Sequence, residues 1–287
     1  MGLNEDDSIH GPDSGNHDIE KIEITLLLEG IYQRYGQDFR SYAYSSIKRR
    51  IKHRMDIEKL KSISELQQKI LYEPIYMQKL LRDFSINVTE MFRDPDFYLS
   101  FRKNVIPMLH SYPFIRIWHA GCSTGEEAYS MAILLHEEGL YQKSKIYATD
   151  MNVDVIEKAK KGVFSYDTMK LYTSNYQKAG GTNAFSEYYT ADQYGVKFEH
   201  FLSKNIVFAQ HNLVTDGSFN EFNVILCRNV MIYFDKQLQN HVHGLFQKSL
   251  SRFGILGLGS KESIRFTPHM ESYEDVDTKN RLYKKLN

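Results

Sequence analysis

The chain has 287 residues, 36 basic and 36 acidic, and two widely separated cysteines, Cys122 and Cys227. This length suits one large domain or two smaller ones, and the balanced charge argues against a basic DNA binder or an acidic disordered chain. Two distant cysteines exclude a disulfide scaffold and a cysteine-rich zinc site, and we expect no bound metal. The sequence contains no apolar run near 18 residues and no signal peptide. We therefore expect a cytoplasmic protein that does not insert into a membrane.

The N-terminal part of the chain predicts a tail followed by helices. Residues 1–19 are polar, with Gly, Asp and Ser and little that is apolar, and we predict a flexible tail. From residue 20 to residue 85 the apolar spacing is helical. Ser62 and Glu65 have the spacing of a capping box at the start of a further helix. We therefore predict a helical N-terminal domain over residues 20–85.

One segment of this domain is strongly basic. Residues 45–61 carry seven basic and two acidic side chains in a chain of zero net charge. The apolar residues that recur there every four positions, and predict the buried face, are Ile47, Ile51 and Met55. We expect Arg50 and Arg54 on the outward face, with Arg49 beside them. The patch is either a solvated helix face or a docking site for an acidic, glutamate-rich helix, and it would also attract an RNA backbone.

After residue 85 short apolar strands alternate with helices, which is typical of a parallel α/β sheet. The predicted strands are 115–119, 145–149, 223–227, 254–259 and 281–286, and the predicted helices are 95–109, 128–138, 153–161 and 237–250. Residues 166–205 interrupt the alternation, and we predict a helix followed by a small antiparallel sheet within 184–198. The expected unit is an α/β domain over 86–287 with this β-subdomain inserted.

The turn from Gly121 to Gly125 joins the first predicted strand to a helix that begins with two glutamates. Ligands of open α/β sheets bind at the carboxyl ends of strands, and glycines let them approach the backbone. The spacing is not that of a dinucleotide site, and Glu126 and Glu127 disfavour a pyrophosphate. An amino-acid-bearing or otherwise cationic nucleoside fits better. The alternative is an ordinary strand–helix turn whose glutamates favour the helix dipole.

The second predicted strand ends at Asp150. An acidic residue there is the expected acceptor for the hydroxyls of a ribose. The alternative is a helix N-cap, a role that Asn152 or Asp154 could also fill.

Four motifs appear in order along the chain: Asn87-Val-Thr-Glu-Met-Phe-Arg93, Gly121-Cys-Ser-Thr-Gly-Glu-Glu-Ala-Tyr-Ser130, Ala148-Thr-Asp150 and Cys227-Arg-Asn-Val-Met-Ile-Tyr-Phe234. Together they closely resemble the chemotaxis receptor methyltransferases of the CheR type. The resemblance implies a Rossmann-like class I methyltransferase sheet with an all-helical N-terminal domain and an inserted β-subdomain. Ala128 departs from the proline that this family carries there, and because proline in a first helical turn mainly fixes φ, we expect little effect.

The resemblance also implies a reaction and its site. The family transfers a methyl group from S-adenosyl-L-methionine to glutamate side chains of chemoreceptor cytoplasmic helices, leaving S-adenosyl-L-homocysteine. Carried over by motif, the cofactor-binding residues would be Asn87, Thr89, Arg93, Gly121, Glu126, Asp150, Asn212, Leu213, Arg228 and Asn229. Arg93 and Tyr233 would face the reacting centre as the catalytic residues. Some members bind a receptor C-terminal peptide on the β-subdomain, and the resemblance suggests a monomer that does not act on DNA.

The implied chemistry needs no general base, because a glutamate carboxylate is already ionised at neutral pH. Alignment and removal of water remain for the protein to supply. Arg93 could hold the carboxylate, or could instead pair with Asp94 or Asp96. Tyr233 could orient one carboxylate oxygen, or could be a core ring with a solvated hydroxyl.

Other functions stay open at this point. A nucleic-acid methyltransferase would use the same cofactor, although the segment from Arg228 to Tyr233 lacks the Asn/Asp-Pro-Pro-Tyr/Phe motif of amino-methylating enzymes. The target could also be another signalling protein, or the chain could be a non-catalytic module that binds the cofactor.

Overall fold

The computed structural model describes residues 12–84, 88–193 and 195–287. The chain divides into two compact units, Met1–Ser85 and Ile86–Asn287. Each unit buries its own set of apolar side chains.

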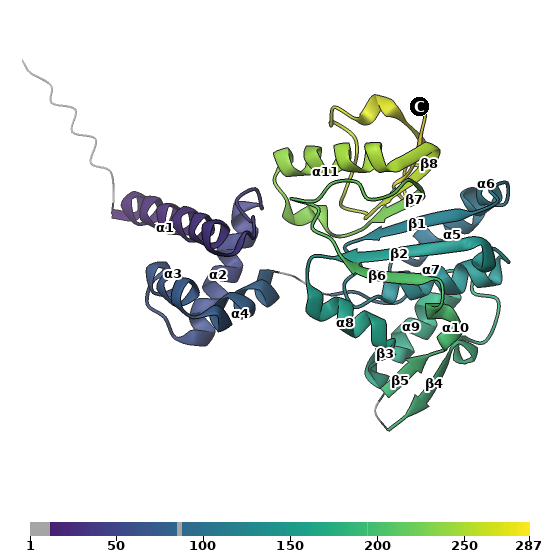
Figure 1. The fold of residues 1–287 in the computed structure, drawn as a ribbon, viewed down its shortest axis with the longest axis horizontal. Coiled ribbons are helices and arrows are strands. Elements are labelled where there is room, and N and C mark those ends of the chain that lie inside the picture. The colour runs from purple at the N-terminus through teal and green to yellow at the C-terminus, as the bar shows by residue number, and fades with distance from the viewer. Residues whose placement is uncertain (1–11, 85–87, 194) are drawn as a thin grey trace, which may run out of the picture. The chain divides into compact units, whose positions relative to one another are not determined.

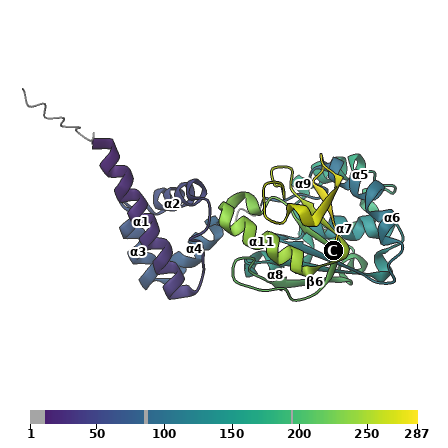
Figure 2. The ribbon, with the colours of Figure 1, turned by 90° about the horizontal axis from the view of Figure 1, so that it is seen from above.

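The N-terminal unit contains the helices α1 (Pro12–Tyr35), α2 (Tyr44–Glu58), α3 (Ile63–Tyr72) and α4 (Pro74–Phe84). α1 packs along α3, and α2 packs against α4 (Figure 2). The predicted cap of α3 is confirmed, since the Ser62 hydroxyl accepts a 3.2 Å hydrogen bond from the backbone N–H of Glu65. The Glu65 carboxylate reaches back to the N–H of Lys61 at 2.8 Å, one residue earlier than in a standard capping box.

The prediction of a flexible tail is wrong for residues 12–19, because α1 already begins at Pro12. Residues 1–11 lie outside the described part of the chain. A proline is tolerated at a first helical position, where its missing N–H would have no partner. Once Leu27 and Ile31 fix the later turns by burial, extending the helix backwards costs little.

The prediction that Arg50 and Arg54 face outward is also wrong. Arg50 is 4% exposed and Arg54 is 8% exposed. The Arg54 guanidinium lies 2.6 Å from Asp83 of α4 and 3.1 Å from Glu58. The buried stripe of α2 therefore includes these two arginines, and for Arg54 the acidic partners inside the unit make burial of a guanidinium acceptable. Arg49 is exposed.

The C-terminal unit is built on a seven-stranded sheet with the order β6-β2-β1-β7-β8-β10-β9 (Figure 1). The strands are β1 (Ile115–Ala120), β2 (Ser144–Asp150), β6 (Ile206–Gln210), β7 (Phe222–Cys227), β8 (Leu250–Leu258), β9 (Tyr273–Asp277) and β10 (Leu282–Lys285). The first five in this order are parallel, and β10 runs antiparallel to β8 and β9. This confirms the predicted α/β class. The strand order reverses at β1, which is where ligands of open α/β sheets bind.

Helices cover both faces of this sheet. They are α5 (Pro95–Asn104), α6 (Ile106–Leu109), α7 (Glu126–Glu137), α8 (Val153–Lys161), α9 (Tyr166–Lys178), α10 (His200–Ser203) and α11 (Lys236–Ser249). In the view of Figure 1, α11 lies near the top of the C-terminal unit, at the height of β8, and α8 and α9 lie lower than β6. The single helix predicted over 95–109 is divided at Val105, because Pro107 lacks the N–H that a continuous helix needs.

The predicted insertion is confirmed as a helix followed by an antiparallel sheet. The strands β3 (Val163–Phe164), β4 (Tyr189–Asp192) and β5 (Gly195–Phe198) pair in the order β3-β5-β4, with α9 between β3 and β4. Glu137 at the end of α7 anchors it. Its carboxylate accepts hydrogen bonds from the Tyr188 hydroxyl at 3.0 Å and the Thr182 N–H at 3.1 Å, and it pairs with Arg102.

Candidate functional site

Four neighbouring parallel strands end beside residues that are predicted to bind the cofactor. β1 is followed by Gly121, β2 ends at Asp150, β6 is followed by Asn212 and β7 by Arg228. These positions are far apart in sequence, and the parallel pairing brings them to one edge of the sheet. The candidate site is therefore this edge, around the point where the strand order reverses.

Asp150 links the ends of β1 and β2. One carboxylate oxygen accepts from the N–H of Ser123 at 3.0 Å, and the other accepts from the N–H of Asn152 at 3.0 Å. Asn152, rather than Asp150, caps α8, since its side chain accepts from the N–H of Asp154 at 2.9 Å. The capping alternative for Asp150 is thus removed. Burial raises the pKa of the Asp150 carboxyl, which backbone hydrogen bonds only partly oppose.

Glu126 is the second carboxylate at this edge, and it is buried. It begins α7, is 5% exposed, and accepts from the Thr124 hydroxyl at 2.6 Å and the Tyr172 hydroxyl at 3.4 Å. Burial raises the pKa of the Glu126 carboxyl. Within the described part of the chain neither Glu126 nor Asp150 forms an ion pair with a basic side chain. Two such carboxylates make a favourable place for a ligand with positive charge and hydroxyl donors.

The glycines of the first turn also allow close packing within the protein. Gly121 has φ of 84° and Gly125 has φ of 96°. A Cβ on Gly121 would lie 2.4 Å from Val230, and one on Gly125 would lie 2.9 Å from Ala159. On these sides the protein itself, rather than a ligand, approaches the backbone. A cofactor contact at Gly121 stays a prediction.

The segment that carries Arg93 is held in a strained conformation. The flanking residues Phe92 and Asp94 have φ of 51° and 56°, which is rare for residues other than glycine. The N–H of Phe92 donates to the Ser130 hydroxyl of α7 at 2.9 Å. The Arg93 guanidinium donates to the carbonyl of Val88 at 3.0 Å. Such strain persists only where surrounding contacts impose it, and it is common at functional sites.

Arg228 binds to the chain next to Arg93. Its guanidinium lies 2.9 Å from Asp94 and 3.0 Å from Glu127, and it donates to the Arg93 carbonyl at 2.9 Å. It also stacks 4.1 Å from the ring of Phe97. Since Asp94 pairs with Arg228, and Asp96 pairs with Lys279 at 2.9 Å, neither forms the ion pair considered for Arg93.

The contacts of Arg228 are with protein groups, so its expected contact with the cofactor stays a prediction. Glu127 joins it to His119 of β1, whose Nδ1 lies 2.8 Å from the other carboxylate oxygen. Burial raises the pKa of the Glu127 carboxyl, but the hydrogen bond from His119 and the charge of Arg228 outweigh it and leave that pKa below its ordinary value.

The remaining predicted residues lie on loops of the same unit. Asn212 closes its own turn, donating from its N–H to Asp216 at 2.8 Å and accepting from the N–H of Val214 at 3.0 Å. Leu213 is 7% exposed. Asn229 has φ of 61°, and Tyr233 ends the 3-10 turn Met231–Tyr233. Thr89 is half-buried, and Asn87 lies outside the described residues.

Two residues at this edge were not predicted from the sequence. Tyr172 of α9 bonds to Glu126, and only the aromatic richness of the insertion pointed to it. Glu262, in the loop after β8, accepts hydrogen bonds from the loop after β7 and lies outside all four motifs.

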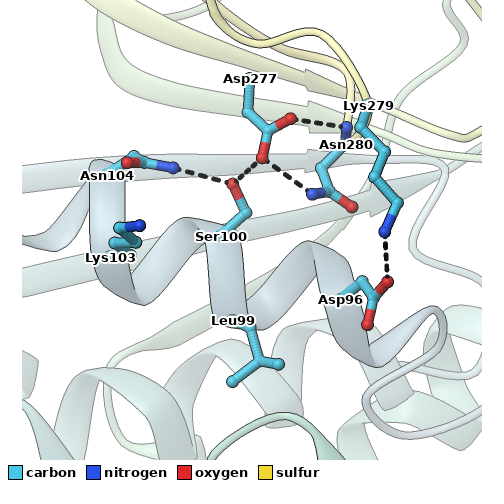
Figure 3. A pocket seen from close by; sticks show the side chains of 8 residues that line it. All are labelled: Asp96, Leu99, Ser100, Lys103, Asn104, Asp277, Lys279 and Asn280. Atoms are coloured by element: carbon cyan, nitrogen blue, oxygen red, sulfur yellow. Dashed lines mark hydrogen bonds and ion pairs between the residues drawn. The ribbon is translucent and has the colours of Figure 1, made fainter.

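A pocket of about 350 Å³ lies between α5 and the turn from β9 to β10 (Figure 3). It is lined by Asp96, Leu99, Ser100, Lys103, Asn104, Asp277, Lys279 and Asn280. Asp277 accepts from the Ser100 hydroxyl at 2.5 Å and from the Asn280 amide at 2.8 Å. The polar side chains that line this pocket largely form hydrogen bonds with one another. None of the predicted site residues is among the lining residues.

Two further properties concern the described residues alone. None of their helices combines the length and the apolar character that a membrane crossing requires. No three of their His, Cys, Asp or Glu side chains gather closely enough to hold a metal ion.

Comparison with known proteins identifies the family. Residues 87–280 match the model of the CheR methyltransferase SAM-binding domain, and residues 22–85 match that of the CheR methyltransferase all-alpha domain. The chain belongs to the CheR methyltransferase family. S-adenosylmethionine is accordingly the cofactor of this CheR chain.

Its relatives extend over nearly the whole chain. A Pseudomonas putida protein, Cher3, which is named as a candidate methyltransferase, is 47% identical over 92% of this chain and 97% of its own length. A chemotaxis protein methyltransferase of Listeria innocua is 31% identical over 86% of this chain and 92% of its own length. A chemotaxis protein methyltransferase of Borreliella burgdorferi is 29% identical over 89% and 93%.

Proposed function

We propose that this protein transfers the methyl group of S-adenosylmethionine to glutamate side chains on the cytoplasmic helices of chemoreceptors. The products are glutamyl methyl esters and S-adenosylhomocysteine. The observation that carries the proposal is the pair of carboxylates at this edge, the buried Glu126 at the start of α7 and the half-buried Asp150 at the end of β2, together with the strained segment of Arg93. Relatives named as chemotaxis protein methyltransferases support the choice of target.

The cofactor would be held by groups on four strand ends. Asp150 would accept hydrogen bonds from the ribose hydroxyls, and Glu126 would pair with positive charge on the amino-acid part. Asn212 and Leu213 would lie near the adenine. The remaining proposed contacts are Asn87, Thr89, Gly121, Arg228 and Asn229. When bound, S-adenosylmethionine supplies an electrophilic methyl group on a sulfonium.

The residues of this chain would bind and align the acceptor. A glutamate carboxylate is ionised at neutral pH, so no base has to remove a proton from it. Arg93 has a neutral acceptor, the Val88 carbonyl, in place of a carboxylate, and its charge is therefore available to a substrate glutamate. Tyr233 would orient one oxygen of that glutamate. Exclusion of water around the acceptor would complete the contribution of the site.

The acceptor protein would dock through charge and through the β-subdomain. Arg49 on α2 is exposed and would face the acidic surface of a receptor helix, whereas Arg50 and Arg54 are buried and are withdrawn from this role. β4 is an edge strand of the inserted sheet, and an extended receptor peptide could pair with it. We propose that the protein acts in the cytoplasm as a monomer.

The test is methylation of receptor-containing membranes with methyl-labelled S-adenosylmethionine. We expect label in receptors that mild base releases as methanol, which identifies methyl esters. The Asp150→Ala variant serves as the control that lacks cofactor binding. Label in added RNA would contradict the proposed target, and no label in any acceptor despite cofactor binding would indicate a non-catalytic module.

A further inference from the structure

Glu262 is a buried carboxylate that every proposed step of the reaction leaves unused. It is 5% exposed and lies in the loop after β8. One oxygen accepts from the backbone N–H groups of Val230 at 2.9 Å and Met231 at 2.8 Å. The other accepts from those of Asn229 at 2.9 Å and Gly259 at 2.7 Å. A single side chain thus satisfies four backbone donors.

These contacts join the ends of two adjacent strands, β7 and β8. Asn229 is left-handed, with φ of 61°, so the chain turns sharply as it leaves β7. A Cβ on Gly259 would lie 2.6 Å from the Glu262 carboxylate and 2.8 Å from the nitrogen of Asn229. No side chain fits at position 259, and the carboxylate is enclosed by the donors that it binds.

The same loop is held from its other side by Gln239 of α11. The Gln239 amide donates to the carbonyl of Met231 at 3.0 Å and to that of Phe234 at 3.1 Å. Glu262 thus binds the N–H groups at the start of the loop, and Gln239 binds carbonyl groups at its end. Tyr233 lies between Met231 and Phe234, the two residues whose carbonyl groups Gln239 binds.

We propose that Glu262 is a positioning residue for methyl transfer, acting through the loop that carries Asn229 and Tyr233. The roles of those two residues rest on the proposed function. Backbone N–H groups that lose a buried acceptor must seek other partners, and the loop would then shift. A displacement of about 1 Å in a group that aligns a reaction can lower its rate about 100-fold.

The test compares Glu262→Gln with the control Glu271→Gln, which removes an exposed carboxylate from the same C-terminal segment. In Glu262→Gln an NH2 group faces N–H donors in place of a carboxylate oxygen. We expect kcat to fall about 100-fold and the affinity for S-adenosylhomocysteine about tenfold, with the KM for receptor unchanged. Glu271→Gln should match the wild type. Wild-type kcat and affinity in Glu262→Gln, even with a lowered melting temperature, would overturn the proposal.

A second measurement needs no variant. In the wild-type protein the N–H groups of Asn229, Val230, Met231 and Gly259 should exchange with deuterium as slowly as those of the neighbouring strands. Exchange at the rate of exposed loops would overturn the proposal. If instead no receptor is methylated by the wild type, the proposed substrate fails, while cofactor affinity and amide exchange still report on Glu262.

Discussion

The guanidinium of Arg228 donates a 2.9 Å hydrogen bond to the backbone carbonyl of Arg93, 135 residues earlier in the chain. The same guanidinium pairs with Glu127 and Asp94. A residue of the fourth motif thereby binds the backbone of the first motif directly and also binds the first turn of α7. The backbone of Arg93 is held in this way, while its guanidinium donates to the carbonyl of Val88.

Replacement of Arg228 by lysine tests this link. Lysine keeps the charge beside Glu127 but lacks the planar fork that reaches several acceptors at once. We expect Arg228→Lys to lower kcat about tenfold and to lower the free energy of unfolding by about 1–3 kcal/mol. Denaturant unfolding and steady-state kinetics measure both. Arg252→Lys, at an exposed position of β8, should change neither, and an unchanged kcat in Arg228→Lys would show that Arg93 needs no such support.

Arg93→Ala should separate methyl transfer from cofactor binding. Loss of the guanidinium removes the proposed charge-assisted bonds to the acceptor carboxylate, so kcat should fall about 100-fold or more. Affinity for S-adenosylhomocysteine, measured by calorimetry, should fall only in part. A fully active Arg93→Ala would remove this residue from the mechanism.

Asp150→Ala should abolish measurable cofactor binding. The proposed ribose acceptor is lost, and so are the bonds that tie the ends of β1 and β2 together. Removal of a charged acceptor for two hydroxyls should weaken affinity about 100-fold or more. Asp154→Ala changes an exposed acid four residues away and should bind normally in the same titration. Wild-type affinity in Asp150→Ala would contradict the assignment.

Cofactor affinity should depend on pH because of the same carboxylates. Burial raises the pKa of Asp150 and of Glu126 above the usual values, so the folded protein without ligand holds their protons to higher pH than the unfolded chain. As pH rises from the unfolded pKa to the folded pKa of each carboxyl, ionisation becomes more costly in the folded protein and lowers the stability of the ligand-free fold. A cationic ligand offsets this cost because it favours the ionised carboxylates. Affinity for S-adenosylmethionine should rise with pH above the ordinary pKa range of carboxyl groups, and binding should release protons.

Calorimetry in buffers with different ionisation enthalpies detects such proton release. Asp150→Asn should reduce it together with the affinity. Proton uptake on binding, or affinity that is highest in acid, would contradict this account of the two carboxylates.

Substitution of the exposed Arg49 should affect receptor binding, whereas substitution of the buried Arg54 should affect stability. Arg49→Glu should raise the KM for receptor several-fold, most at low salt, and leave the melting temperature and cofactor affinity unchanged, because Arg49 is exposed. Arg54→Ala should lower the free energy of unfolding by about 3–5 kcal/mol, because Asp83 and Glu58 would lose their buried partner. An Arg54→Ala variant of wild-type stability would mean that the ion pair is not formed in solution.

The sequence predicted those parts of the structure that follow from local pattern. Apolar runs and glycines indicated β1, β2, β7 and the turn at Gly121, and the sheet order that unites them follows from ordinary α/β topology. Two strands of the main sheet were missed, as was β3 of the inserted sheet. β6, whose residues run straight on from the long insertion, carried no separate signal, and β9 is acidic, with the sequence Tyr-Glu-Asp-Val-Asp.

The errors came from interactions between distant residues. A basic helix face is normally solvated, and nothing near Arg54 in sequence indicates that Asp83 of another helix will pair with it. The closeness of Val230 to Gly121 likewise depends on a residue more than 100 positions away, while the expected cofactor contact at Gly121 stays a prediction. Glu262 carries no signal because its four partners are backbone N–H groups, which any residue type except proline provides.

The place of Glu262 in the chain bears on which fragments can be active. All four motifs lie before residue 235, so a chain that stops at Leu258 would retain every motif that carries the resemblance to the family. It would lack Gly259 and Glu262, and the N–H groups of Asn229, Val230 and Met231 would have lost their common acceptor. If Glu262 positions this loop as proposed, a competent fragment has to include residue 262, well beyond the last recognisable motif.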